Sequence, residues 1–489
     1  MTLTERLAAW AAGLAFDDVP PRVVAYAKSQ VLSQLGAARA TRSHPLGPAI
    51  VQALGDPASA PDPKQAACAL AALTMALDFD DTVYAGHVSH SAVAVPLAYA
   101  RPLGLDGRDL LAAVVAADEC AARVTAAATI GPFRGQTAAH THLAGGVAAR
   151  LRAEAAPADR WVSAWGIAFA APPWPLTRAF LGSDAKVLTA SVPLRVALDA
   201  CDAAAAGLSG AADILEHPDG FLARFSDVPL PDAAVADLGR RWHTETLSFK
   251  VYPACAYLDA VLDCAVELHH ALTPADLATV AEVVVHASIF TVAMDLRSAP
   301  YVCGPRSPVS ALTFSVAYSV ATALLTGGLA PGDLAPAALD EARRWDLAGR
   351  VRLELDDALT HRALTATAPI GEALRQAGDR AAPWLRSAGG ERAEALLREL
   401  GPPSPGFDHA DKAIGARVEV RLADGRVLRS ERDVPLGAAG PETREHHPAL
   451  TRQKFLACGG EPEVADALAR LDELGPADVA AALAAALAG

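Results

Sequence analysis

LDFDDTVYAGHVSHSAVAVP, residues 77–96, places three carboxylates, a threonine and two imidazoles between two apolar runs, residues 70–77 and 92–100. If both flanks are helices, the polar residues occupy a loop or a broken helix at the edge of a buried bundle. A loop held by rigid neighbours is a common place for proton-transfer groups. Residues 78–82 also include good helix N-caps. Capping does not account for His87 and His90, so we interpret the segment as a site.

The amino-acid composition favours a mainly α-helical protein. Apolar residues make up 52% of the 489 residues and aromatic residues only 5%, so the core must consist largely of alanine, leucine and valine. Alanine and leucine are strong helix formers, and this mixture favours closely packed helices. The length is ample for a large core and is typical of two domains.

The charge distribution limits the class of partner. The formal net charge is −14 and Lys and Arg do not cluster, which argues against nucleic acid. An anionic substrate would have to be attracted by local cations rather than by the whole surface. The seven cysteines are scattered and form no CxxC pair, as is typical of a reducing compartment, and they offer no iron–sulfur or zinc spacing.

Two segments bear on whether the chain meets a membrane. The first ten residues contain Glu5 and no basic region before a long apolar stretch, so we expect no signal peptide. Residues 307–332 carry no charge but contain two prolines and several serines, threonines and glycines, so we interpret them as a buried helix followed by a turn. The expectation is a soluble, cytoplasmic protein with no membrane partner.

Periodicity predicts helices throughout the first half of the chain. In residues 21–35, for example, Val24, Ala27, Val31 and Leu35 recur at helical spacing after Pro20-Pro21, a helix start. Further helical patterns cover residues 3–14, 64–77, 92–99, 109–128, 142–155, 161–171 and 194–207.

The character of the sequence changes after about residue 247. Residues 279–286, 350–355 and 416–422 are strand-like, and the last run leads through Ala423-Asp424-Gly425 into 426–430, a hairpin signal. Helical patterns at 256–272 and 312–325 lie between them, and an Ala- and Leu-rich helical pattern returns from about residue 445. We therefore predict a helical domain over residues 1–247, a smaller α+β domain over 248–434, and a C-terminal segment, 435–489, that returns to the helical domain.

Further polar islands lie in apolar surroundings. Residues 131–146, GPFRGQTAAHTHLAGG, hold Arg134 and place His140 and His142 on different sides of a helix. A lone histidine there is as often a satisfied core residue as a catalytic one. Residues 182–193 hold Lys186, which could bind a carboxylate or stabilise an enolate; its alternative role is a surface lysine at a helix end.

The proposed domain junction carries another candidate group. In LSFKVYPACAYLD, residues 247–259, Lys250 and Cys255 precede a helix whose N-terminus could bind an anion. Junctions between domains are favoured ligand sites. Tyr318 lies on an otherwise apolar helical segment and needs a hydroxyl partner if it is buried; core filling is its alternative role.

Several motif classes are missing from the sequence. It contains no GxGxxG, GxxxxGK[ST], HExxH or GxSxG pattern, which removes the usual signatures of nucleotide binding, zinc peptidases and serine hydrolases. The remaining His, Lys, Asp and Tyr side chains suit acid–base chemistry next to a carboxylate.

Taken in order, these stretches resemble the MmgE/PrpD family, which includes 2-methylcitrate dehydratases, cis-aconitate decarboxylases and iminodisuccinate epimerases. The resemblance runs nearly from end to end, and it rests on the order and spacing of the motifs more than on any one of them. The motifs are LTERLAAWAAGL with DDVPPRVVAYAK, LDFDDT, AKVLTASVP, KVYPACAYLDAVLD, SPVSALTFSVAYSVA, and the closing hairpin with RQKFLACGG.

The resemblance implies a large all-helical domain, an inserted smaller α+β lid domain, and a homodimer with the site in the cleft. It also implies that no metal or other cofactor is needed. The family's active-site residues correspond to Asp78 and Thr82, His87 or His90, a second histidine near His142, two lysines at Lys186 and Lys250, and a tyrosine at Tyr318.

The chain departs from the family pattern in two places. The family commonly has His-Pro-Ser/Gly before the small-residue run, whereas GHVSHSAV leaves the position of the histidine open between His87 and His90. Several decarboxylase-type members have a histidine where this chain has Cys255. Both changes lie where proton transfer would occur, and they argue against itaconate-forming decarboxylation.

These observations predict a metal-independent lyase of the dehydratase type that acts on a small di- or tricarboxylic hydroxy acid. A histidine would take the proton next to a carboxylate while Lys186 and Lys250 stabilise the enolate-like charge. Asp78 and Thr82 would orient that histidine or the substrate, and Tyr318 could donate to the leaving hydroxyl.

Alternatives and secondary residues stay open at this point. Arg134 and Arg306 are further candidates for binding a carboxylate. Isomerisation, epimerisation or decarboxylation of a related polycarboxylate is the alternative outcome, and a catalytically inactive binding protein is another. Retention of Lys186, Lys250 and Asp78 argues against the inactive protein.

Overall fold

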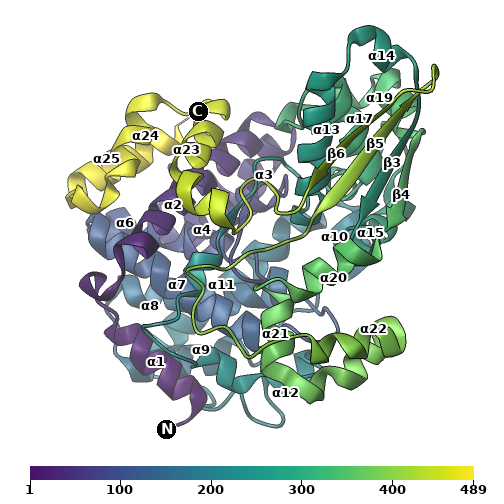
Figure 1. Cartoon of the computed structure of the whole chain (residues 1–489). Coiled ribbons are helices and arrows are strands. Elements are labelled where there is room, and N and C mark those ends of the chain that lie inside the picture. Colours follow the sequence, from purple (N-terminus) through teal and green to yellow (C-terminus); the bar gives the residue numbers. More distant parts are fainter. Residues whose placement is uncertain (489) are drawn as a thin grey trace.

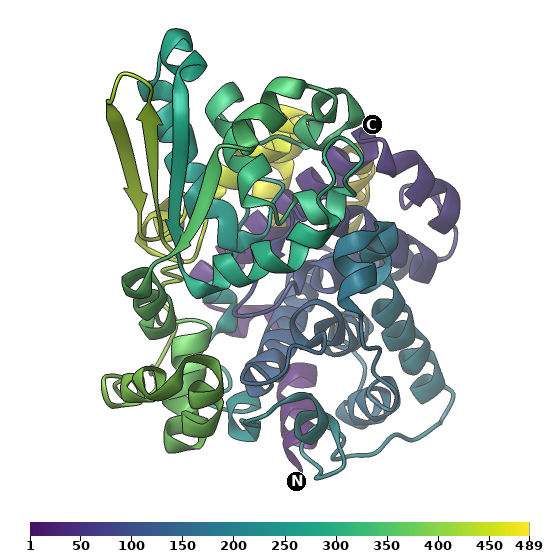
Figure 2. The same cartoon turned by 90° about the vertical axis from the view of Figure 1, so that its right-hand side faces the viewer.

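The computed structural model describes residues 1–488; for residues 388–394 it describes the backbone and not the side chains. Figure 1 shows a broad body of helices with a small sheet at one side, and Figure 2 shows the strands of this sheet side by side at the left. The prediction of a mainly α protein is confirmed. The helices before the sheet region are α1 (Leu3–Gly13), α2 (Pro21–Ser43), α3 (Leu46–Leu54), α4 (Pro63–Met75), α5 (Ser89–Ala92), α6 (Ala94–Leu103), α7 (Gly107–Ala127), α8 (Thr141–Ala153), α9 (Ala158–Ala168), α10 (Thr177–Gly182), α11 (Leu188–Ala205) and α12 (Phe221–Phe225).

The body is built around α7 and α8, which lie side by side. Small residues make this packing possible: a Cβ added at Gly145 would lie 2.8 Å from Oγ of Ser91, and one added at Gly146 would lie 2.7 Å from Cδ1 of Leu194. The glycines near the start of α8 therefore allow neighbouring segments to approach closely. One continuous core results, and it contains the buried tryptophans Trp161 and Trp165.

A four-stranded sheet and the helices that pack on it enclose a second hydrophobic core. Its strands are β3 (Val280–Ala287), β4 (Val351–Leu355), β5 (Ala416–Leu422) and β6 (Val427–Arg432), in the order β4-β3-β5-β6, with β3 and β4 parallel and the other pairs antiparallel. The predicted hairpin is confirmed: β5 turns into β6 at Gly425, whose φ is +90°. The sheet prediction succeeds because alternating β-branched residues mark the strands.

The sheet is covered on one face. Val283, Val285, Val418 and Val420 pack with helices α13 and α17, whereas Glu282 pairs with Arg352 and Arg421 on exposed side chains. The helices of this region are α13 (Asp259–Ala271), α14 (Pro274–Ala278), α15 (Ile289–Ser298), α16 (Val309–Leu312), α17 (Val316–Thr326), α18 (Pro336–Leu339) and α19 (Ala342–Ala348). The charged face follows from the period of two that places alternate residues on opposite faces.

Two later segments return to the helical body. Helices α20 (Asp357–Thr365), α21 (Ile370–Ala377) and α22 (Ala382–Ala395) precede β5, and apolar residues between 368 and 410 belong to the first core. The last helices, α23 (Pro441–Ala457), α24 (Pro462–Ala469) and α25 (Pro476–Leu487), pack against α2 and α6 (Figure 1). The domain limits at 248 and 434 stay a prediction.

A substitution at Gly107 tests how closely the C-terminal segment packs on the helical body. A Cβ at this position would lie 1.5 Å from the carbonyl oxygen of Leu471, a backbone atom that cannot rotate away. We expect Gly107→Ala to lower the free energy of unfolding by about 3 kcal/mol or more, as overpacking does when backbone must shift. Urea unfolding measures the loss. Gly13→Ala, where nothing lies within 4 Å, is the matched control and should be nearly neutral.

Candidate functional site

A two-stranded antiparallel pair brings the polar segment 77–82 against the residues around Lys250. Strand β1 (Asp81–Thr82) pairs with β2 (Ser248–Phe249), with Asp81 opposite Phe249 and Thr82 opposite Ser248. This register carries Asp80 to Lys250, although the two are separated by 170 positions in the chain. Residues 248–250, which begin the segment singled out in the sequence, thus lie opposite residues 80–82 in the site.

Lys250 holds two buried carboxylates. Its ammonium donates to Oδ1 of Asp80 at 2.8 Å, to Oδ1 of Asp78 at 3.1 Å and to the carbonyl of Asp78 at 2.9 Å. Asp78 has a φ of +54°, a backbone conformation that is strained for residues other than glycine. The hydrogen bond from Lys250 to the carbonyl of Asp78 helps to maintain this conformation. Burial alone would lower the pKa of Lys250, but Asp78 and Asp80 raise it above its usual range.

Lys186 completes the neutralisation of this pair. It lies in the short 3-10 turn Asp184–Val187, and its ammonium is 3.4 Å from Oδ1 of Asp78 and 3.4 Å from Oγ1 of Thr313. The rings of Phe180 and Phe314 lie beside the ammonium, at 5.4 and 4.7 Å. Burial lowers the pKa of Lys186, and Asp78 only partly opposes this. Lys186 is therefore a buried cation, and the alternative role of a surface lysine at a helix end is wrong.

Two imidazoles share the second oxygen of Asp80. Nδ1 of His87 lies 2.7 Å from Oδ2 of Asp80, and Nε2 of His90 lies 3.2 Å from the same oxygen. Burial would raise the pKa of Asp80, but Lys250 and the two imidazoles hold it well below its usual range. An ionised carboxylate can only accept hydrogen bonds, so His87 donates its Nδ1–H to Asp80, and Nε2 is the ring nitrogen that does not bind Asp80.

The two neighbouring histidines are more enclosed. His90 contacts Oγ1 of Thr74 through Nδ1 at 2.8 Å, and His142 contacts Oγ of Ser91 through Nδ1 at 3.0 Å. Burial lowers the pKa of His90, and burial together with the other two histidines lowers that of His142 well below its usual range. Both rings are fully buried, whereas the side chain of His87 is 25% exposed. His87 is thus the imidazole of this group that solvent can reach.

Three buried atoms at the site have no hydrogen-bond partner among the residues described. They are Oδ2 of Asp78, Nε2 of His142 and Nε2 of His90, which lies near Asp80 without forming a hydrogen bond to it. An unsatisfied buried polar atom is costly, and at a functional site it marks a place where a ligand can supply the partner. The cluster therefore combines two cations, two carboxylates and three imidazoles with unused hydrogen-bonding capacity.

Two further predicted residues, Cys255 and Thr82, lie at the border of this cluster. Cys255 is buried, its N–H donates to the carbonyl of Thr313, and burial with Asp78 nearby raises its thiol pKa to about 12. Thr82 is half-buried, and both its carbonyl and its hydroxyl face the ammonium of Lys412. Both residues thus border the cluster.

Three predicted residues are held elsewhere. The hydroxyl of Tyr318 donates to the carbonyl of Asp333, and its ring packs on Trp345, among apolar neighbours that include Leu77. Arg134 donates to the carbonyl of Arg224 at 2.6 Å. Arg306 is exposed, and no contact joins it to the cluster within the described residues. Their roles stay predictions.

Sequence reasoning missed two carboxylates as site residues. Asp80 is the shared centre of the cluster, and Asp259 is fully enclosed near Lys250, with burial raising its pKa well above the usual range. The partners of Asp80 and Asp81 differ: Asp80 faces Lys250, whereas the oxygens of Asp81 accept from Ser33 at 2.6 Å and Gln34 at 3.0 Å. Recognising this difference depends on knowing that residues 81 and 82 form a strand.

Asp80, His87 and His90 also form the set that could hold a metal ion. One ligand atom from each lies within 4.8 Å of the others. A divalent cation there would replace the proton between His87 and Asp80 and would lie next to the ammonium of Lys250, which already binds the other oxygen of Asp80. The donor set fits a transition metal, whereas the neighbouring positive charge opposes one.

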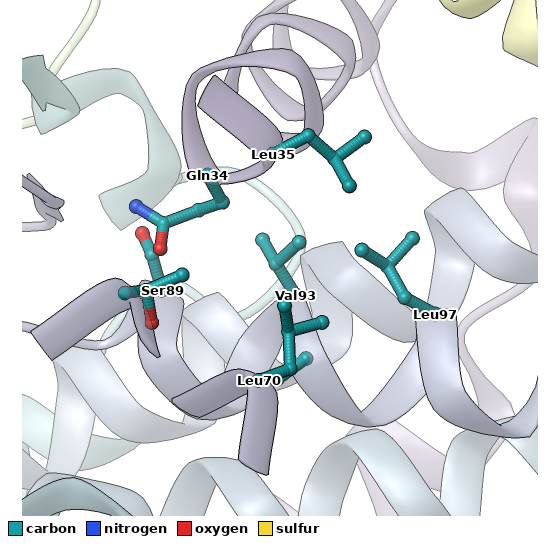
Figure 3. A pocket seen from close by; sticks show the side chains of 8 residues that line it. Gln34, Leu35, Leu70, Ser89, Val93 and Leu97 are labelled. Carbon is teal, nitrogen blue, oxygen red and sulfur yellow. The ribbon is translucent and has the colours of Figure 1, made fainter. Parts of the chain in front are cut away.

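The hollows in the structure differ in character from the cluster. Leu35, Leu70, Val93 and Leu97 converge on one beside Gln34 and Ser89, inside the helical body (Figure 3). An open cavity of about 490 Å³ lies between the loop at Gly131 to Phe133, Arg297 of α15 and Trp384 of α22. Its lining brings the helical body, the sheet region and α22 together.

The comparisons with known proteins agree with the sequence motifs. The family model described as the MmgE/PrpD N-terminal domain matches residues 5–233, and the MmgE/PrpD C-terminal domain matches residues 252–382. No curated protein matches the chain. Among the described residues, no helix has the length and apolar character that crossing a membrane requires.

Replacing Lys250 with methionine would leave Asp78 and Asp80 with Lys186 as their remaining ammonium. We expect the free energy of unfolding to fall by roughly 3–5 kcal/mol, the cost of removing one partner from a buried ion pair. Urea unfolding measures the change. Lys28→Met, which removes a partly exposed ion pair with Asp472, is the matched control and should cost less than about 1 kcal/mol. Equal small losses would contradict the role assigned to Lys250.

His140, in the π-helical turn Gln136–His140, makes stability depend on pH. Burial lowers its pKa to about 4, whereas an unfolded histidine titrates near 6.5. Between these values the unfolded chain binds more protons, so stability falls as the pH falls from about 6.5 to about 4. We expect His140→Gln to reduce that slope by up to about 1.4 kcal/mol per pH unit. Unfolding at several pH values tests this, with the exposed His409→Gln as control.

Proposed function

The chain belongs to the MmgE/PrpD family, and on that premise we propose that it is a metal-independent lyase of the dehydratase type. Its substrate would be a small di- or tricarboxylic hydroxy acid. The family includes dehydratases, which supports the general activity. The observation that carries the proposal for this chain is the ionised Asp80 between Lys250 and His87, next to the desolvated Lys186.

His87 is the proposed base. Its Nδ1–H is held by Asp80, so the free Nε2 can remove the proton from the carbon next to a substrate carboxylate. Asp80 then stabilises the imidazolium that forms, as a carboxylate does in other His–Asp pairs. Partial exposure lets a substrate approach this ring, which favours His87 over the enclosed His90 and His142.

The lysines are proposed to handle the charge that develops. Electrons from the broken C–H bond pass to the substrate carboxylate, and a pre-placed ammonium stabilises that enolate-like charge. These electrons then return to form a C=C bond as the C–O bond at the next carbon breaks, and the hydroxyl takes a proton and leaves as water. Lys186 is the proposed donor because burial lowers its pKa. Tyr318 is not assigned this step, since its hydroxyl donates to the carbonyl of Asp333.

Isomerisation or epimerisation is a second candidate outcome. The rings of His87 and His90 are nearly parallel with centroids 6.2 Å apart, and His142 lies 5.6 Å from His90. Removal of a proton at one carbon and its return at another carbon or face needs two bases, and this group contains more than one imidazole. Association of two copies, which the family resemblance implies, also stays a prediction.

The experiment that tests the function is proton NMR of chelator-treated protein in heavy water with citrate, 2-methylcitrate and cis-aconitate. Loss of water, loss of carbon dioxide and deuterium exchange without net change give different spectra. Full activity after chelation is expected, because the proposed steps use side chains alone. Dependence on an added divalent metal would overturn the metal-independent mechanism.

His87→Gln should lower kcat by about 10²–10⁴-fold, the usual contribution of a general base. Deuterium incorporation into the same substrates should fall by a similar factor, and the circular dichroism spectrum should not change. His446→Gln, at an exposed position of α23, is the matched control and should retain wild-type activity. Normal turnover in His87→Gln would exclude His87 as the base.

A further inference from the structure

Lys412 is a buried lysine that neither the reaction steps nor the sequence motifs use. It lies in the segment between α22 and β5, and its side chain is 6% exposed. Its backbone N–H donates to the carbonyl of Ala439, whose own N–H donates to Oγ of Ser248. Because Ser248 pairs with Thr82 in the β1–β2 ladder, these bonds fix Lys412 beside β1, the strand that Asp80 immediately precedes.

The ammonium of Lys412 has weak partners. It lies 3.3 Å from Oγ1 and 3.4 Å from the carbonyl oxygen of Thr82, and both are neutral atoms at long hydrogen-bond distance. The other enclosed lysines differ: Lys186 and Lys250 each meet Asp78, and Lys454 lies 3.8 Å from Asp81. Within the described residues, no carboxylate forms an ion pair with Lys412. A buried ammonium without an anion is costly.

Charged groups on the neighbouring segments are engaged elsewhere. Asp411, next in the chain, accepts from the N–H of Thr367 at 2.8 Å. Asp81 faces Ser33 and Gln34, and Arg444 donates to the carbonyl of Ala410 at 2.8 Å. None of these groups supplies the missing negative charge.

Strand geometry relates this lysine to the catalytic cluster. Asp80 immediately precedes β1 (Asp81–Thr82). If the alternation of a strand extends to it, Asp80 and Thr82 project from the same side, about 7 Å apart, while Asp81 projects from the other. The contacts agree: Asp80 faces Lys250, Thr82 faces Lys412, and Asp81 faces Ser33. Asp80 and Thr82 thus each face a lysine. Protein carboxylates neutralise Lys250, whereas Lys412 forms no ion pair within the described residues.

We propose that Lys412, together with the hydroxyl of Thr82, binds a second carboxylate of the substrate, remote from the carbon that loses its proton. This inference rests on the proposed function and adds a specificity-determining residue to it. Asp80 and Thr82, which face Lys250 and Lys412, are two residues or about 7 Å apart. This spacing fits a short di- or tricarboxylic acid whose first carboxylate lies near Lys186 and Lys250. Selectivity for acids with a second carboxylate follows from this arrangement, because a ligand without one leaves the ammonium unpaired.

The proposal has a thermodynamic consequence that a purely structural lysine would not have. Burial lowers the pKa of Lys412 to about 7, so the amine is only partly protonated in the free protein near neutral pH. A bound carboxylate favours the protonated form, and ligand binding above pH 7 should therefore take up a proton at this residue. In the absence of ligand, Lys412→Met should stabilise the fold or leave it unchanged, because it removes a buried group that lacks an anion.

Isothermal titration calorimetry of the full chain with citrate, 2-methylcitrate and cis-aconitate tests the proposal. Titrations at pH 8 in two buffers with different ionisation enthalpies give the number of protons taken up. We expect Lys412→Met to weaken binding at least tenfold and to lose the proton uptake at this residue, while Lys412→Arg retains part of the affinity. Lys28→Met is the matched control and should bind like the wild type. With a substrate that turns over, KM should rise more than kcat falls.

The outcomes separate this inference from the function on which it rests. If the wild type binds or converts one of the acids and Lys412→Met does so with the same affinity and proton uptake, the role of Lys412 is wrong and the lyase proposal stands. If the wild type neither binds nor converts any of them, both fail. Lys412→Gln provides a second uncharged variant should Lys412→Met not fold, and unchanged binding in it overturns the inference equally.

Discussion

The buried group of Lys250, Asp78 and Asp80 is the interaction on which the site depends. It joins the end of α4 to the strand that precedes α13, and it holds Asp78 in a left-handed backbone conformation. Two ammonium groups, Lys186 and Lys250, balance two carboxylates, so the cluster can be buried as a neutral unit. Burial of such a unit is acceptable only when every charge has a partner, and each lysine here meets at least one carboxylate.

The surrounding fold explains how so many polar groups can be enclosed. Thr74 on α4 holds His90, and Ser91 on the single turn α5 holds His142, which lies on α8. Asp80, which immediately precedes β1, holds His87. Glycines on α8 permit the close helix contacts behind these rings. A rigid surrounding fixes both the ring orientation and the protonation state, which is what proton transfer requires.

Much of the fold could be predicted from the sequence, because helical and strand periods are local signals. The four strands of the sheet and the long helices lie where the apolar spacing indicated. The site could be predicted as a set of segments, but not as a set of contacts. Asp80 rather than Asp81 meets Lys250 because of a short strand register, and Tyr318 donates to a backbone carbonyl that has no sequence signal.

Charge balance also determines what the protein can recognise. A polycarboxylate brings several negative charges, whereas the ammonium groups of Lys186 and Lys250 already face Asp78 and Asp80. With an overall charge of −14, the surface offers no general attraction for an anion. Recognition of a second carboxylate therefore requires a cation that the protein leaves without an anion, and an enclosed lysine can meet this need at some cost in stability. Lys412 meets that requirement beside Thr82, two residues after Asp80.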